Sequence, residues 1–127
     1  MITLNLLKLL ENNNLGTIDK DLFWEKLTLG KIGVYVSSLG ATNERGSRRM
    51  QTFELYSRGN SDVAGYRRLK DIVDFLNASY SVCTLPAVDN ISEPIENITI
   101  MPMSSIVNGG LDDNGRIIWT ATGTIYY

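Results

Sequence analysis

The sequence predicts an α+β domain, in which a mixed or mainly antiparallel β-sheet is flanked by two helices and ends in a C-terminal β-hairpin. Apolar residues recur at helical spacing near the N-terminus and over residues 62–78, whereas apolar and polar residues alternate over residues 49–57 and 116–127 as in half-buried strands. With 127 residues the chain can bury one core without disulfides or metal ions. We therefore expect a single domain over residues 1–127.

The first helix is expected at the N-terminus. Thr3 is placed to cap it, and the asparagines at positions 12–14 end it. Its apolar positions repeat with helical spacing, at Leu4, Leu7 and Leu10. Residues 15–29 are mixed in character and predict only a short turn or half-strand that packs on the core.

Two strands are expected in the middle of the chain. Residues 32–37 are rich in β-branched and aromatic side chains, and residues 49–57 alternate, with Phe53 and Leu55 on one face. Residues 39–47 between these strands contain glycine, threonine and asparagine, and they predict a flexible loop.

The most regular helical pattern covers residues 62–78. Ser61 is a good N-cap, and Asp62 favours the positive end of a helix. One apolar stripe follows, formed by Val63, Tyr66, Leu69, Val73 and Leu76. Residues 80–97 contain two prolines, which interrupt helices and strands, so we expect a long connection there.

The C-terminal residues predict a β-hairpin with strands over residues 98–107 and 116–127. The connection over residues 108–115 contains Gly-Gly and Asn-Gly pairs, which adopt positive φ at little cost. Pro102 has no N–H to donate, so the first strand is expected at a sheet edge or a bulge, where a neighbour's strand could pair. The last strand has one apolar face and one largely threonine face, which predicts helices on one side of the sheet.

The chain contains no histidine, which excludes Ser–His–Asp and Cys–His catalysis and removes the commonest general base near neutral pH. Cys83 is the only cysteine, so no disulfide forms within the chain, and its apolar neighbours indicate a half-buried thiol. Paired carboxylates fall in expected turns or on a helix surface, where solvation explains them: Asp19/Asp21, Asp71/Asp74, Glu93/Glu96 and Asp112/Asp113. We expect no enzyme, no cofactor and no metal site, and a small enzyme is the least favoured alternative.

The overall composition is that of a soluble globular protein, with 43% hydrophobic and 20% charged residues. No apolar stretch approaches the roughly 20 residues that cross a bilayer, and residues 1–10 lack the features of a signal peptide. We therefore expect a cytoplasmic protein without membrane contact.

Charge is distributed unevenly along the chain. Residues 45–70 contain seven basic and two acidic residues, whereas residues 71–127 contain one basic and seven acidic residues. This polarity favours head-to-tail contact between identical subunits, in which a basic patch meets an acidic one. Nucleic-acid binding is the competing interpretation, which the net charge of −2 and the pI near 5.0 disfavour. The third interpretation is an ordinary charged surface on which basic and acidic residues are separated by chance.

Two stretches of the sequence resemble a known family. Arg49-Met50-Gln51-Thr52-Phe53-Glu54-Leu55-Tyr56-Ser57-Arg58-Gly59-Asn60, followed by the expected helix through Gly65-Tyr66 and Leu69, is similar to the middle of the minor capsid or tail-terminator proteins of long-tailed bacteriophages. Leu85-Pro86, and Gly110-Leu111-Asp112-Asp113-Asn114-Gly115-Arg116 before the final strand, stand where that family places its closing hairpin. The resemblance covers residues 47–127, and the expected N-terminal helix also fits it.

The resemblance implies a structural virion protein, a tail terminator that assembles as a homo-hexameric ring on the tail tube. Such a ring ends tube polymerisation and joins the tail to the head. The implied partners are further copies of the chain, the major tail tube protein and the head connector or stopper protein, while DNA passes through the ring without sequence-specific binding. The implied location is the head-proximal end of the virion tail, after assembly in the host cytoplasm. A head-completion or stopper protein is the alternative.

Within that family role, five residues are candidates for subunit or tail-tube contacts. Arg45, Arg48 and Arg49 are expected at a subunit contact or on an arm that reaches the tube, with a solvated loop as the alternative. Arg58 is expected to bridge to a neighbour's carboxylate, unless its partner lies within the subunit. Pro102 marks the edge strand.

Overall fold

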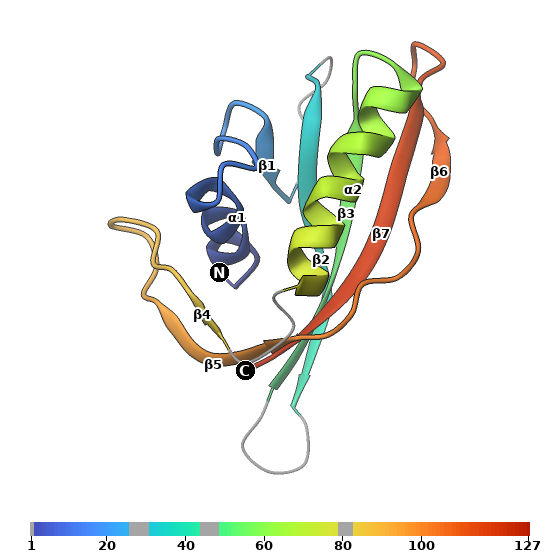
Figure 1. Ribbon diagram of the computed structural model, residues 1–127. Coiled ribbons are helices and arrows are strands. Elements are labelled where there is room, and N and C mark those ends of the chain that lie inside the picture. The colour runs from blue at the N-terminus through green and yellow to red at the C-terminus, as the bar shows by residue number, and fades with distance from the viewer. Residues whose placement is uncertain (1, 26–30, 44–48, 79–82) are drawn as a thin grey trace.

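The computed structural model of the protein describes residues 2–25, 31–43, 49–78 and 83–127, with the backbone alone for residues 41–43 (Figure 1). These residues form the predicted α+β fold. In chain order the elements are α1 (Ile2–Asn12), β1 (Leu22–Trp24), β2 (Gly33–Asn43), β3 (Arg49–Arg58), α2 (Asp62–Ala78), β4 (Cys83–Leu85), β5 (Ile95–Ile100), β6 (Val107–Leu111) and β7 (Ile117–Tyr126).

The strands form one mixed sheet in the order β1-β2-β3-β7-β5-β4, with β6 also paired to β7. β1 runs parallel to β2, and every other pairing is antiparallel. Strands β5 and β4 curve away from the long strands and pass around α1 (Figure 1). β3 and β7 are long and lie at the centre of this strand order.

Helix α1 begins at Ile2, so Thr3 lies inside the helix and the prediction that it caps the helix is wrong. The Thr3 hydroxyl instead donates to the Glu25 carboxylate at 3.2 Å and accepts the indole N–H of Trp24 at 2.8 Å. The carboxylate of Glu25 thus lies at the positive end of α1, where it stabilises the helix. Trp24 shows that β1, the half-strand expected within residues 15–29, does pack on the core helix.

Strand β2 is longer than predicted, and the expected loop over residues 39–47 is wrong for residues 39–43. Ser38 pairs with Phe53 and Gly40 pairs with Thr52, so Leu39 is the additional residue of a β-bulge. The bulge lets the strand continue past a glycine at φ +137°, because pairing with β3 satisfies the backbone that local composition assigned to a loop. Residues 44–47 lie outside the described residues.

Helix α2 begins and ends where the sequence predicts. The Ser61 hydroxyl accepts the N–H of Ala64 at 3.1 Å and so caps the helix. Leu69, Ile72 and Leu76 are fully buried. The turn from β3 into α2 is tight, because a Cβ on Gly59 would lie only 2.5 Å from the backbone nitrogen of Gly65.

The strand expected over residues 98–107 is interrupted: residues 98–100 belong to β5, and Val107 begins β6. The rest of β6 lies in the connection expected over residues 108–115, so that prediction is wrong for residues 108–111. β5 and β6 pair with opposite ends of β7. Residues 101–106 between them still run along β7: Met101 donates to the Thr124 carbonyl at 2.9 Å, and Ser104 to the Thr122 carbonyl at 2.9 Å. Pro102 cannot donate in this row, and the next residue, Met103, donates to Asn77 of α2 at 2.8 Å. The expected connection over residues 80–97 likewise contains β4 and the start of β5.

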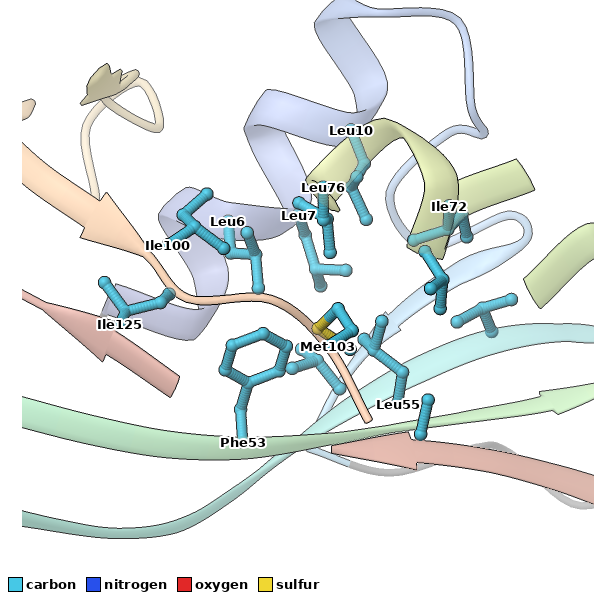
Figure 2. Packing of buried hydrophobic residues seen from close by; sticks show 14 of the residues in the cluster. Leu6, Leu7, Leu10, Phe53, Leu55, Ile72, Leu76, Ile100, Met103 and Ile125 are labelled. Carbon is cyan, nitrogen blue, oxygen red and sulfur yellow. The ribbon is translucent and has the colours of Figure 1, made fainter. Parts of the chain in front are cut away.

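Both helices pack on one face of the sheet, and a single core lies between the helices and the sheet. The side chains that meet there come from both helices, from β3, β5 and β7, and from the segment after β5 (Figure 2): Leu6, Leu7, Leu10, Phe53, Leu55, Ile72, Leu76, Ile100, Met103 and Ile125. Within the part of the chain that the structure describes, the opposite face carries no helix (Figure 1). The threonine-rich pattern of β7 predicted this one-sided arrangement.

Candidate subunit-contact surface

The structure separates the residues that the sequence nominated for contacts. Arg45 and Arg48 lie outside the described residues. Arg49 is exposed at the start of β3, where its backbone pairs with that of Tyr127, and Arg58 lies at the other end of the same strand. Pro102 is exposed and lies near the Arg49 end, in a depression of about 250 Å³ that Thr52 and Thr124 also line.

Arg58 is buried, with 7% of its surface exposed, and its ion-pair partner belongs to the same chain. Its Nη1 lies 3.5 Å from Oδ2 of Asp112, and its Nε donates to the carbonyl of Lys31 at 3.0 Å. Asp112 also accepts from Nε of Arg116 at 3.0 Å. Arg58 therefore fastens the turn between β6 and β7 to the segment that enters β2.

Asp112 is the centre of this cluster, because only 4% of its side chain is exposed. Its Oδ1 accepts the backbone N–H groups of Asn114 at 2.9 Å and Arg116 at 2.8 Å. Burial raises the pKa of Asp112, but these hydrogen bonds and the Arg116 guanidinium outweigh burial and hold the pKa below its ordinary value. The sequence identified Asp112 as a turn residue but carried no local signal for its pairing with Arg58.

Folding cancels part of the charge polarity seen along the sequence. Within the basic segment over residues 45–70, Arg68 and Lys70 are paired as well as Arg58: Nη2 of Arg68 lies 2.7 Å from the Asp21 carboxylate, and Nζ of Lys70 lies 3.1 Å from that of Asp74. Among the described residues, Arg67 is exposed and makes no ion pair. The polarity of the surface is therefore weaker than the sequence alone predicts.

The helix-free side of the sheet, here called the open face, is defined by Tyr35, Ser37, Thr52, Glu54, Tyr56, Thr122 and Thr124 from β2, β3 and β7. All seven side chains are half-buried. The rings of Tyr35 and Tyr56 stack with centroids 4.5 Å apart and an angle of 7° between their planes. Among the residues that define the open face, Glu54 alone carries a charge.

Burial and the neighbouring Glu54 raise the pKa of Tyr56 to about 12. Burial also raises the pKa of Tyr35. Both phenols therefore stay neutral at physiological pH, and the open face presents stacked rings and hydroxyl groups. Such a face can make hydrogen bonds and aromatic contacts without desolvating many charges.

Strand β6 forms an edge beside the open face. All five of its residues are exposed, including Val107 at 54% and Leu111 at 65%. Its pairing with β7 shifts register between Asn108 and Leu111, which limits the length over which another strand could pair with it.

The thiol of Cys83 and the carboxylates are further groups that could carry chemistry. Cys83 is half-buried in β4, and burial raises the pKa of its thiol, which keeps it protonated near neutral pH. Within the described ranges there is no group of three or more His, Cys, Asp or Glu side chains placed to hold a metal ion. In the same ranges neither helix has the length and apolar character needed to span a membrane.

A scan against models of protein families gives no match, and a search of curated proteins finds no similar protein. A functional proposal for this chain therefore rests on its geometry and on its resemblance to the tail-terminator family.

Proposed function

We propose that this protein is a structural virion subunit of a long-tailed bacteriophage, a tail terminator that forms a ring on the tail tube. In this role it ends tube polymerisation and joins the tail to the head, without catalysing a reaction. The observation that carries the proposal is the one-sided architecture: two helices cover one face of the sheet, and the open face is left for protein contacts. The resemblance of residues 47–127 to the terminator family supplies the particular role.

The chemistry of the open face supports a protein partner. Interface cores are enriched in aromatic residues and depleted of charge, and the stacked Tyr35–Tyr56 pair beside the threonines of β7 has both properties. The rings and β-branched side chains lie on paired strands, so little conformational entropy is lost when a partner covers them. Arg49, with Arg45 and Arg48 close in sequence, is proposed for contact with the tail tube protein or a neighbouring copy.

Assembly state and mutant particles together test this function. Native mass spectrometry and light scattering should show a hexamer, either free in solution or formed when tail tubes are added. Phage that lack the gene should produce overlong tails. If the protein stays monomeric and ignores tail tubes, the proposal is overturned. Normal-length tails beside separate heads that leak DNA would instead identify a head-completion or stopper protein.

A variant of the open face sharpens the test. Tyr56→Arg places a charge in the centre of that face and should prevent ring formation while the subunit stays folded, because the replaced side chain is half-buried and faces away from the core. Asp113→Arg is the matched control, since Asp113 is exposed in the turn after β6. Rings of normal stability from Tyr56→Arg would exclude the open face as a ring contact.

A further inference from the structure

A groove runs along the first turns of α2, beside the segment that enters β2. Its volume is about 470 Å³, and its apolar lining residues are Ile32, Val63 and Ala64. Val63 is 67% exposed, which is unusual for a residue on the apolar stripe of a helix. The close approach of Gly59 to Gly65 draws the chain tightly into α2 at the groove.

The groove is also charged. Arg67 follows Val63 by one helical turn, so both side chains lie along the same side of α2. Arg68 lies deeper, where Asp21 accepts from its Nη2 at 2.7 Å, while its Nε is buried without a hydrogen-bond partner among the described residues. Asp71 lines the far end of the groove. Asp21 already offsets Arg68, so Arg67 is the cation that a partner in the groove would meet.

On another side of the molecule, beyond α1, a tight turn lies between β4 and β5 (Figure 1). The Val88 carbonyl accepts the N–H groups of Ile91 at 3.0 Å and Ser92 at 2.9 Å, and Ser92 Oγ accepts the N–H of Val88 at 3.1 Å. Asn90 at the centre of the turn has φ 62°. The turn presents Ile91, which is 60% exposed, to solvent.

A buried side chain holds this turn in place. Asn5 of α1 is fully buried, its Nδ2 donates to the Glu93 carbonyl at 2.7 Å, and its Oδ1 accepts from Ser92 Oγ at 2.7 Å. A polar side chain in the core is therefore used to fix a turn whose apolar residue points outward. This rigidity favours binding, because the turn loses little conformational freedom when a partner covers it.

From these two features we propose that the turn over residues 88–92 of one copy inserts Ile91 into the groove of a second copy. Ile91 covers Val63 and Ile32 there, and a carboxylate of Asp89 or Glu93 pairs with Arg67. Both carboxylates are exposed and flank Ile91, and among the described residues neither makes an ion pair. Asp89 also lies near Lys8, whose closer partner is Glu11 at 2.8 Å.

This contact is heterologous, because the turn and the groove are different surfaces. Each copy then presents one turn and one groove to its neighbours. A chain of copies closes into a ring when the rotation between neighbours allows it. The inference rests on the proposed function, since it names a second contact between the ring subunits, on surfaces separate from the open face. It also assigns the charge polarity of the sequence to particular residues, the basic Arg67 and the acidic Asp89 or Glu93.

Cross-linking between two single-cysteine variants tests the contact directly. In a Cys83→Ser background, Val63→Cys and Ile91→Cys are prepared separately; neither alone should form a disulfide-linked dimer, whereas their mixture should, because only unlike surfaces meet.

Charge reversal gives a second readout by sedimentation velocity. Arg67→Glu should weaken association about tenfold or more, and adding Asp89→Lys and Glu93→Lys should restore it. Lys70→Glu, an exposed change outside the residues that line the groove, is the control.

The outcomes separate this inference from the proposed function. A wild-type protein that associates while the mixture gives no cross-link above the single variants overturns the turn-in-groove contact and leaves the ring proposal standing. A wild-type protein that remains monomeric at concentrations up to about 1 mM, with and without tail tubes, overturns both. Thermal unfolding of each variant verifies folding, and the exposure of Val63, Arg67 and Ile91 predicts little change.

Discussion

The guanidinium of Arg58, at the end of β3, lies 3.5 Å from the carboxylate of Asp112, in the turn that joins β6 to β7. Both side chains are almost fully shielded from solvent. Arg116 pairs with the same carboxylate. Removing the Asp112 carboxylate therefore leaves two guanidinium groups without this anion. Removal of one member of a shielded ion pair is generally more harmful than replacement of both.

A double-mutant cycle should show this asymmetry. Asp112→Ala should lower the urea midpoint of unfolding more than Arg58→Met combined with Asp112→Ala, because the double variant leaves one fewer unpaired charge. Additive effects of the two single changes would show that the residues do not interact. Asp113→Ala, in the exposed neighbouring position, is the control.

The same carboxylate predicts a pH dependence. Burial raises the pKa of Asp112, but its hydrogen bonds and Arg116 bring it below the ordinary value of 3.8. The folded state therefore binds this proton less tightly than the unfolded chain, so the ionised group stabilises the fold above that value and the contribution is lost as the pH falls through the folded pKa. The stability difference between wild type and Asp112→Asn should be constant from about pH 7 to 5 and shrink below about pH 4. A difference that does not change with pH would contradict this.

Tyr56 predicts a second titration, at high pH. Its pKa of about 12 results first from burial and then from the hydrogen bond and charge of Glu54. The folded state resists losing this proton, so stability should decline as the pH rises above about 10, where unfolded tyrosines ionise. Ultraviolet absorbance should show a late-titrating phenol that disappears in Tyr56→Phe. An unchanged titration curve in that variant would assign the late phenol elsewhere.

Gly123 allows the core to close around Phe53. A Cβ at this position would lie 2.4 Å from Sδ of Met103 and 2.5 Å from Cζ of Phe53. Met103 is flexible, but the ring is packed, so Gly123→Ala should destabilise the fold by about 1–3 kcal/mol through overpacking. Chemical denaturation measures the change, and Thr122→Ala, on the open face of the same strand, should change stability much less.

Asn5 should control the order of the turn that carries Ile91. Asn5→Ala leaves the Glu93 carbonyl and the Ser92 hydroxyl without their partner, which costs about 1–3 kcal/mol. Hydrogen exchange should accelerate at the amides of Ile91 and Ser92 more than in the long strands. Asn13→Ala is the matched control, because its bond to the Leu9 carbonyl is exposed. Equal protection of the turn in both variants would show that Asn5 does not hold it.

The contact residues proposed from sequence illustrate how far local reasoning extends. Arg58 was recognised as a charge at a strand end, but its partner is set by the antiparallel pairing of β3 with β7, which brings the β6–β7 turn beside it. Val63 was assigned to the apolar stripe of α2 and is instead exposed, because helical periodicity gives the side of a helix but not which turns of that side are covered. Asn5 and the turn near Ile91 gave no sequence signal, since the residues that meet there are distant in the chain.

The sequence by itself determined the α+β class, the bounds of α2, the alternation of β3 and the presence of a C-terminal hairpin, but not the bounds of the hairpin's first strand. These features arise from local patterns: a capping serine, a 3.6-residue period, a two-residue period and glycines at a turn. Tertiary structure decided that β2 continues through a bulge to Asn43, and that residues 95–111 divide into β5 and β6 around a buried Met103. The reason is that backbone pairing and core volume are shared between segments remote in sequence, so neither strand length nor the covered part of a face follows from local preference alone.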